Sequence, residues 1–333
     1  MDENKPKIKD RFGRIHNYLR ISLTERCNLR CFYCMPEEGI ELRDKAEFMS
    51  AEELVHIAKI FVDLGVTKIR LTGGEPLIKK NAASIIRELG KLPVELAITT
   101  NAVVVDRFVD VFKEAGIKSV NVSLDSLEED RFNAISRRNY FKAVRKNIDL
   151  LIAHKFTVKI NVVVIRDVNE HEIINFVHWS KKENVHIRFI EFMPFEGNSW
   201  KTEKKFPYNE ILNKVSQHLG VNGYYKVSDA PNDTSKNFRV VDGLGTFGII
   251  SSITNPFCDT CNRLRLTADG KIKNCLFSEE ESDLLGALRK GSDLKQIIQS
   301  AIKQKHKERG GLSKFSNEEV QSRKNRAMTA IGG

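Results

Sequence analysis

Short apolar segments alternate with longer amphipathic segments from residue 18 to about residue 193, and this alternation constrains the fold more than any other feature of the sequence. Six segments have the length and apolar content of strands: Tyr18–Leu23, Val66–Leu71, Val94–Thr99, Ser119–Leu124, Thr157–Ile165 and His186–Phe192. Between them lie stretches with helical periodicity, such as Ala51–Leu64 and Phe141–His154. Six strand–helix units in series predict an α/β fold with a parallel sheet, wound as a barrel or as a doubly wound sheet.

Polar side chains recur at every second position of these strands, and this alternation places each set on one face. Helices should cover the opposite, apolar face, so the polar face should point inward. The interior of a closed eight-stranded barrel is instead filled by Val, Ile and Leu. The sequence therefore predicts an incomplete (β/α)6 TIM-type barrel that holds a polar ligand. The inward positions are Arg20, Ser22, Thr24, Lys68, Arg70, Thr72, Asn121, Ser123, Asp125, Lys159 and Asn161.

Unusual short motifs follow the expected strands. They are RCNLRCFYC (Arg26–Cys34), TGGEP (Thr72–Pro76), TTN (Thr99–Asn101), SLDS (Ser123–Ser126) and Met193-Pro194. Barrel and doubly wound enzymes build their active sites at the carboxyl ends of parallel strands. We therefore expect the functional site at this end of the sheet.

The last third of the chain has a different pattern. A linker-like stretch, Phe195–Lys205, leads to a helix at about Tyr208–Leu219, and further helices are expected near Ser282–Arg289 and Leu294–His306. We expect a core domain at residues 11–225 and a smaller α+β C-terminal domain at residues 226–333, although the boundary could fall anywhere between residues 200 and 245.

The composition indicates a protein of a reducing compartment, the cytoplasm. The amino terminus is polar and lacks the apolar region of a signal peptide, and six cysteines in 333 residues do not resemble a disulfide framework. The net charge of +10 favours an anionic partner or a solvated basic surface. The basic residues are dispersed, apart from Lys303–Arg309 and Arg323–Arg326, and aromatic residues do not interleave with them as in a nucleic-acid stacking platform.

The six cysteines form two groups of three. Cys27, Cys31 and Cys34 have the spacing C-x3-C-x2-C, and Cys258, Cys261 and Cys275 have the spacing C-x2-C-x13-C. Four cysteines close a four-iron cluster, whereas three leave one iron open to substrate. The first spacing favours iron–sulfur over zinc, because no histidine lies close to it in sequence. The second spacing alone is as compatible with zinc, but its lack of a fourth cysteine favours a second open cluster.

The first motif, with the aromatic Tyr33 before its last cysteine, resembles the signature of radical S-adenosylmethionine enzymes, and GGEP (Gly73–Pro76) strengthens the match. The second triad and the terminal Gly332-Gly333 narrow the resemblance to the GTP 3′,8-cyclase family, which acts first in molybdenum cofactor biosynthesis. The resemblance covers nearly the whole chain. It implies a lyase that converts GTP to 3′,8-cyclo-7,8-dihydro-GTP.

The resemblance also implies two [4Fe-4S] clusters and S-adenosyl-L-methionine as cofactors. In that family, one electron from the first cluster splits the sulfonium and gives a 5′-deoxyadenosyl radical. The radical removes hydrogen from carbon 3′ of the GTP ribose, and the sugar radical attacks carbon 8 of guanine. The cofactors supply the difficult chemistry, and the protein positions the reactants.

Residue by residue, the resemblance assigns three kinds of site. The ligands of the first cluster are Cys27, Cys31 and Cys34, and those of the second, which binds guanine, are Cys258, Cys261 and Cys275. S-adenosylmethionine would contact Tyr33, Gly74, Ser123 and Met193. GTP would contact Arg20, Arg70, Thr99, Lys159, Arg188, Arg263 and Arg265. Catalytic roles are implied for Arg263, Arg265 and the tail residues Gly332 and Gly333, which are expected to reach into the active site.

Simpler interpretations exist for single residues. Adjacent glycines suit an ordinary tight turn, and a lone strand arginine is usually a surface ion-pair partner. The chain departs from the family at Ala102, where glycine is more frequent after TTN, so the shape of that loop is in doubt. A conventional GTPase is excluded, since no G-x-x-x-x-G-K-[ST] loop occurs.

Two other functions compete with the leading one. The first is a different radical S-adenosylmethionine enzyme with an auxiliary cluster, such as a peptide maturase. The second is a zinc-bearing nucleic-acid-binding protein. For the leading function, the expected partners are GTP, a reductant such as flavodoxin and cyclic pyranopterin monophosphate synthase as the next enzyme, with a homodimer as the expected assembly and no membrane contact.

Overall fold

The computed structural model describes residues 7–36, 38–40, 43–198, 200–312, 315–321 and 325–332. At its centre are six parallel strands, each paired with the next in chain order. These strands are β1 (Tyr18–Ser22), β2 (Lys68–Thr72), β3 (Glu95–Thr100), β4 (Ser119–Ser123), β5 (Thr157–Val164) and β6 (His186–Glu191). All six lie within two residues of their expected bounds, so the predicted parallel α/β sheet is confirmed.

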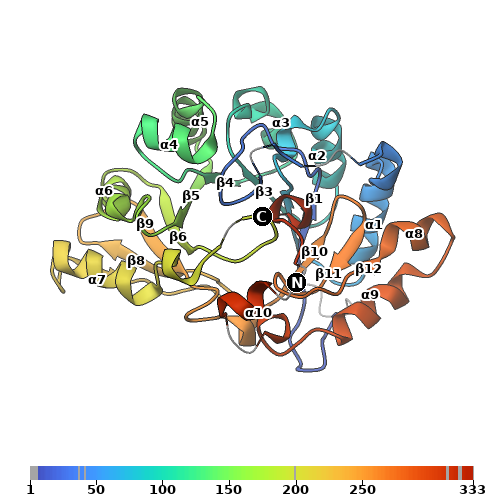
Figure 1. Cartoon of the computed structure of the whole chain (residues 1–333). Coiled ribbons are helices and arrows are strands. Elements are labelled where there is room, and N and C mark those ends of the chain that lie inside the picture. The colour runs from blue at the N-terminus through green and yellow to red at the C-terminus, as the bar shows by residue number, and fades with distance from the viewer. Residues whose placement is uncertain are drawn as a thin grey trace.

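Helices connect these strands and cover one face of the sheet. They are α1 (Ala51–Asp63), α2 (Ala82–Gly90), α3 (Val109–Glu114), α4 (Glu129–Ser136), α5 (Phe141–Ala153) and α6 (Ile173–Lys182). The sheet curves strongly, and these helices lie on its outside (Figure 1). The inner face is therefore left to the polar strand positions and to the loops at the strand ends.

The last third of the chain extends the same sheet at both ends. Beyond β6 lie β9 (Thr246–Ile250), parallel to it, then β8 (Lys236–Val240) and β7 (Tyr224–Lys226). Beyond β1 lie β10 (Arg263–Leu266), also parallel, then β11 (Lys271–Lys273) and β12 (Ser282–Asp283). The result is one sheet of 12 strands with β12 and β7 at its edges. Helices α7 (Tyr208–Leu219), α8 (Leu284–Arg289) and α9 (Leu294–Lys303) accompany these strands.

The apolar core lies between the sheet and the outer helices, and α1 shows how the sequence builds it. Leu54, Ile57 and Phe61 are spaced three and four residues apart, so they share one side of the helix, and all three are buried. The helix begins at a capping box, in which Ser50 accepts a hydrogen bond from the amide of Glu53 and the Glu53 carboxylate accepts one from the amide of Ser50.

Two aromatic side chains of the expected linker, Phe195–Lys205, are buried, so its described residues do not form a free linker. The Phe195 ring stacks on that of Phe277, with centroids 6.4 Å apart, and Phe195 is 9% exposed. Trp200 is also buried, and its indole N–H donates to the carbonyl of Phe192 at 2.9 Å. The polar residues of this stretch suggested a linker, but its two aromatic side chains attach it to the body of the protein.

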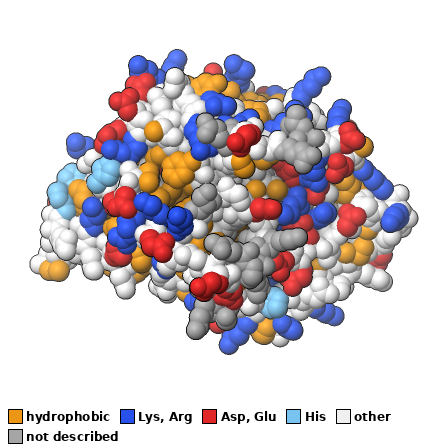
Figure 2. Space-filling model, in the orientation of Figure 1, with side chains coloured by type: hydrophobic (Ala, Val, Ile, Leu, Met, Phe, Trp, Pro, Cys, Tyr) orange, Lys and Arg blue, Asp and Glu red, His pale blue; other side chains and the backbone are white. Residues whose placement is uncertain are grey.

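The surface carries charge of both signs. On the face shown in Figure 2, basic and acidic side chains are interspersed and do not separate into single-sign patches. Among the described residues, none of the helices has the combined length and apolar character that crossing a bilayer requires.

Glu191, the last residue of β6, joins three segments. It is fully buried, and its carboxylate accepts hydrogen bonds from the backbone amides of Ile253 at 3.0 Å, Thr254 at 3.1 Å and Tyr208 at 3.2 Å. The Thr254 hydroxyl also donates to it. One side chain thus fixes the start of α7 and the approach to the second cysteine group.

We expect Glu191→Ala to lower the free energy of unfolding by about 3 kcal/mol, because several buried donors lose a charged acceptor. Urea denaturation of the apoprotein measures this change. Glu203→Ala, at an exposed position, is the matched control and should change stability by less than about 0.5 kcal/mol. Equal stability of the two variants would contradict the role given to Glu191.

Candidate functional site

The strand register brings the expected polar residues together. Arg265 on β10 pairs with Arg20 on β1, and Arg20 pairs with Arg70 on β2. Across the sheet, Lys159 on β5 is in register with a β4 neighbour, while Arg188 on β6 pairs with Asn161 on β5. Since residues directly opposite each other in a sheet share a face, these cations lie along one inner surface.

These side chains repel one another electrostatically. Burial, with added repulsion from Arg70, lowers the pKa of Arg188 to about 9. Burial and then Arg188 lower the pKa of Lys159 to about 8. Burial also lowers the pKa of Arg20 to about 10 and that of Arg265 further still. Cations held this close together destabilise one another's charged forms, and a bound polyanion would relieve that repulsion.

Hydrogen bonds hold several of these groups in place. The Arg70 guanidinium donates to the Tyr18 hydroxyl at 2.5 Å and to the carbonyl of Ile98 at 3.0 Å. Arg188 donates to the side-chain oxygen of Asn161 at 2.5 Å. These hydrogen bonds fix the orientation of both guanidinium groups.

Tyr18 and Thr99 complete the inner surface near these cations. Burial would raise the pKa of the Tyr18 phenol, but Arg70 and Arg20 outweigh it and bring the value to about 7. The buried hydroxyl oxygen of Thr99 has no hydrogen-bond partner among the described residues, so it is available to a ligand. Asp233 is the carboxylate whose charge partly offsets those of Lys159 and Arg188.

The first cysteine triad occupies the loop after β1. The carbonyl of Cys31 accepts hydrogen bonds from the amides of Cys34 at 2.9 Å and Met35 at 3.1 Å, which forms a compact turn. Burial raises the pKa of Cys27 to about 11 and that of Cys34 to about 12. Burial also raises the pKa of Cys31 well above its usual value. Such thiols stay protonated until a metal supplies positive charge.

N–H groups point at the sulfur of Cys27. The amide of Leu29 lies 3.4 Å from this sulfur, and the side-chain amide of Asn101 lies 3.7 Å from it. Asn101 is held by Asn28 at 2.7 Å and by the Glu75 carboxylate, which accepts from its backbone amide at 2.6 Å. Donors directed at sulfur favour a thiolate, so this environment suits a metal-bound cysteine.

The glycines of GGEP are required by packing. A Cβ on Gly73 would lie 2.5 Å from the carbonyl oxygen of Thr24, and one on Gly74 would lie 2.3 Å from that of Arg26. The amide of Gly74 donates to the Thr24 carbonyl at 2.7 Å. Only glycine permits this approach, so the loop after β2 supports the segment that leads into Cys27.

Tyr33, Cys34 and Met193 line a small cavity of about 40 Å³ beside the first triad, together with Met328 from the end of the chain. The Tyr33 hydroxyl donates to Asp125 at 2.6 Å, so the ring is fixed in orientation. Two expected residues, Gly74 and Ser123, do not line this cavity; Gly74 lies in the loop after β2, and Ser123 is the last residue of β4.

The second triad lies where the chain enters β10 and leaves β11. These two strands pair antiparallel, with Arg265 opposite Lys273, so Cys275 returns to the vicinity of Cys258 and Cys261. Burial raises the pKa of Cys258. It would do the same at Cys261, but Arg263 and Lys305 outweigh it and lower that pKa to about 6. These two cations therefore favour the thiolate form of Cys261.

Cationic and amide donors also surround the second triad. Arg263 lies 3.8 Å and the Lys305 ammonium 3.5 Å from the Cys261 sulfur. The amide of Arg309 lies 3.5 Å from the Cys258 sulfur. This environment suits an anionic metal–thiolate group.

The end of the chain lies between the two triads. The carbonyl of Gly332, after α11 (Met328–Ile331), accepts a hydrogen bond from Arg265. The Gly332 backbone lies against β2, because a Cβ there would be 2.4 Å from the Thr72 hydroxyl. The backbone of Thr329 contacts Cys34. Gly333 lies outside the described residues.

Arg326 anchors this segment. It donates to Glu281 at 2.8 Å, Glu25 at 2.9 Å and Asp269 at 3.2 Å. These carboxylates belong to three different loops, one of which precedes Cys27. Arg43 also pairs with Glu25 at 2.6 Å, which extends the ion-pair network.

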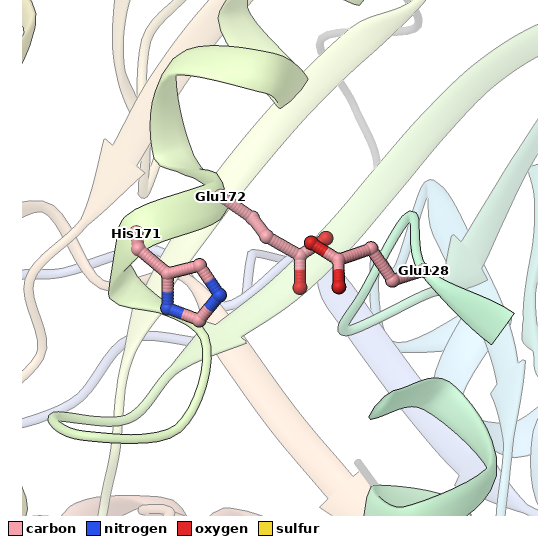
Figure 3. Close-up of side chains that lie close together, drawn as sticks. All are labelled: Glu128, His171 and Glu172. Carbon is pink, nitrogen blue, oxygen red and sulfur yellow. The ribbon is translucent and has the colours of Figure 1, made fainter. Parts of the chain in front are cut away.

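One further group of side chains resembles a metal site, but its buried carboxylate already accepts hydrogen bonds from other residues. The ligand atoms of Glu128, His171 and Glu172 lie within 4.8 Å of one another (Figure 3). Glu172 is fully buried, however, and already accepts hydrogen bonds from the Ser126 hydroxyl at 2.7 Å and from Arg131 at 2.7 Å. This carboxylate therefore holds the loop after β4 in place.

Sequence reasoning missed three residues of the site. Asn101 lies in the TTN motif, so a signal was present. Lys305 and Arg326 lie in the two basic stretches, to which the sequence analysis assigned no role in the site. Lys305 is only 2% exposed, and Arg326 forms ion pairs with three carboxylates. Nothing in the sequence separates them from their basic neighbours.

Two family models match most of the chain. Residues 21–180 match the model of the Radical SAM superfamily, and residues 185–310 match Molybdenum Cofactor Synthesis C. In the solved structure of Streptococcus suis SuiB bound to S-adenosylmethionine, the fold is similar, with a TM-score of 0.66. That match has 14% identity and covers 88% of this chain and 69% of the other, so it bears on the fold alone.

Full-length relatives narrow the family. The chain is 42% identical to a GTP 3′,8-cyclase of Listeria welshimeri, covering 98% of this chain and 99% of the relative. It is 43% identical to the mitochondrial GTP 3′,8-cyclase of Arabidopsis thaliana, covering 97% and 83%. It spans about half of some longer relatives, such as molybdenum cofactor biosynthesis protein 1 of Drosophila melanogaster, at 45% identity with 92% and 55% covered. The chain belongs to the radical S-adenosylmethionine superfamily and, within it, to the GTP 3′,8-cyclase family of molybdenum cofactor biosynthesis.

Proposed function

We propose that this chain converts GTP to 3′,8-cyclo-7,8-dihydro-GTP by radical chemistry. The observation that carries the proposal is the set of mutually repelling cations on the inner face of the sheet, between two cysteine triads. A nucleoside triphosphate is a ligand that relieves such repulsion, and guanidinium groups bind its oxygens in pairs.

The proposed S-adenosylmethionine site is built around the first triad. Cys27, Cys31 and Cys34 would hold a [4Fe-4S] cluster, and the remaining iron position would bind the cofactor. When bound, this pair supplies the 5′-deoxyadenosyl radical. The chain's own contribution is to place Tyr33 and Met193 beside the cofactor and to exclude water from the cavity that they line. Gly74 and Ser123, at the ends of β2 and β4, would complete the site.

The proposed second cluster is held by Cys258, Cys261 and Cys275. The cationic and N–H donors around these sulfurs support a metal–thiolate group at this place. The lack of a fourth cysteine beside them favours an open iron–sulfur cluster over zinc.

The chain's polar residues would orient GTP between the two triads. Arg20, Arg70, Lys159 and Arg188 would bind the triphosphate, with Thr99 as a hydroxyl donor. Arg263 and Arg265, next to the second triad, would act at the reacting nucleotide, and Gly332 would fix Arg265 through its carbonyl. Such positioning makes an otherwise bimolecular encounter effectively intramolecular.

The same assignment leads to proposals about the barrel, the domains, the assembly and the partners of the chain. We propose that the six central strands act as an incomplete (β/α)6 barrel, that residues 226–333 form the auxiliary-cluster domain, and that the chain works as a homodimer. A flavodoxin-type reductant would supply the electron, and cyclic pyranopterin monophosphate synthase would take the product. Six free cysteines suit a reducing compartment such as the cytoplasm.

Iron analysis tests the two-cluster proposal. Anaerobic reconstitution should load about eight irons per chain, four on each triad. Replacing Cys27, Cys31 and Cys34 together by Ser should leave about four, and replacing Cys258, Cys261 and Cys275 should leave about four as well. A reconstituted wild type with four irons or fewer, or one with bound zinc, would overturn the second cluster.

Lys159 tests the GTP site through pH. The wild type should form 5′-deoxyadenosine only when GTP is present, with KM for GTP rising as the pH passes about 8, because Lys159 then loses its positive charge. Arg188, Arg70 and Lys68 oppose this charge, and Asp233 favours it. Lys159→Met should raise KM roughly tenfold at pH 7 and remove the rise near pH 8.

The matched control for this prediction is Lys142→Met, at a side chain that is 85% exposed, and it should behave as the wild type. Formation of 5′-deoxyadenosine without GTP, or stimulated by a peptide and not by GTP, would favour a peptide maturase instead.

The chain end gives another prediction. Residues appended after Gly333 should greatly reduce GTP-dependent turnover without changing iron content, because Gly332 lies directly against Thr72 and bonds to Arg265. The same residues placed before Met1 provide the control. Turnover equal to that of the wild type in the C-terminally extended chain would show that the tail has no role in the reaction.

A further inference from the structure

Lys305 occupies an unusual position for a lysine. It lies two residues after the end of α9 and is 2% exposed. Its ammonium donates to the carbonyl of Asn274 at 2.5 Å, to the carbonyl of Arg263 at 3.1 Å and to the sulfur of Cys261 at 3.5 Å. All three donor positions of the ammonium therefore have a partner.

These acceptors belong to the two segments that carry the second triad. Arg263 is two residues after Cys261, and Asn274 immediately precedes Cys275. One side chain thus connects the entry to β10 with the exit from β11. Asn274 is fixed from the other side as well, because its side-chain amide donates to the carbonyl of Ala301 on α9 at 2.7 Å.

The charge of Lys305 has a specific counterpart. A buried ammonium is costly unless it is paired and hydrogen-bonded. No carboxylate of the described residues forms an ion pair with Lys305, and two of its three partners are neutral carbonyls. The remaining partner is the Cys261 sulfur at 3.5 Å, so a thiolate-ligated cluster on the second triad would supply the negative charge beside Lys305.

We propose that Lys305 is a positioning residue of the second iron–sulfur cluster. It holds the Cys261 and Cys275 segments at a fixed separation, and its charge stabilises the reduced, more negative form of the cluster. Hydrogen bonds and charges next to the cysteine sulfurs are established determinants of cluster potential. This inference rests on the proposed second cluster.

The test isolates that cluster in the full-length chain. Replacing Cys27, Cys31 and Cys34 by Ser leaves iron on the second triad alone. In this background, Lys305→Met removes the charge and the donors, whereas Lys305→Gln removes the charge and keeps a donor. Lys303→Met, on an exposed residue at the end of α9, is the matched control.

The readouts are the midpoint potential, from a redox titration followed by electron paramagnetic resonance, and the iron retained after a chelator wash. Both Lys305 variants should shift the one-electron reduction equilibrium at least about tenfold towards the oxidised form, which is about 59 mV. Lys305→Met should also lose most of its iron, and Lys305→Gln should lose less. Lys303→Met should match the background chain.

The outcomes separate the two proposals. If the background chain with Lys305 intact takes up no iron–sulfur cluster, the second cluster itself is refuted. If that chain loads about four irons and Lys305→Gln keeps both the iron and the potential, the role of Lys305 is refuted. Because Lys305→Gln retains a hydrogen-bond donor, it should disturb the separation of the two segments less than Lys305→Met does, and the iron that it retains provides the sample for the potential.

Discussion

Repulsion among cations held close together is the constraint on which the rest of this structure depends. Arg265, Arg20 and Arg70 occupy paired positions on three adjacent parallel strands. Neighbouring strands are about 4.8 Å apart, so the backbone keeps these three residues close together. Each lowered pKa among these cations corresponds to a free-energy cost of folding. Burial of apolar side chains between the sheet and the outer helices offsets this cost.

The two triads each consist of three cysteines but have opposite electrostatic surroundings. Carboxylates lie near the first triad, where Asp125 and Glu75 add to the effect of burial on the thiols. Arginine and lysine lie near the second, where they overcome the effect of burial at Cys261. This contrast matches the proposed ligands, because S-adenosylmethionine carries a sulfonium and an ammonium while GTP carries a triphosphate. Charge thus provides a physical basis for directing each ligand to its own triad.

The features of the fold and of the candidate site that depend on residue periodicity and spacing could be predicted from the sequence. Strand bounds followed from apolar length, the inner face from alternation, and the two candidate metal sites from cysteine spacing. The extension of the sheet at both ends could not be predicted, because β7 and β11 have three residues each and too few positions to show a pattern. Ala102 shows how the fold overrides local preference. It adopts a left-handed φ of 62°, which costs a non-glycine residue about 1 kcal/mol, and the Asn147 side chain holds its carbonyl at 2.7 Å.

The pairing of β10 with β1 and of β9 with β6 determines when the sheet can be completed during synthesis. The ribosome releases β1 first, but its outer neighbour is more than 240 residues further along the chain, so β1 waits with an unpaired edge until almost the whole polypeptide has emerged. Unpaired strand edges are templates for aggregation. Assembly of this protein should therefore be most vulnerable during translation, and insertion of the late strands should be the event that protects the nascent chain.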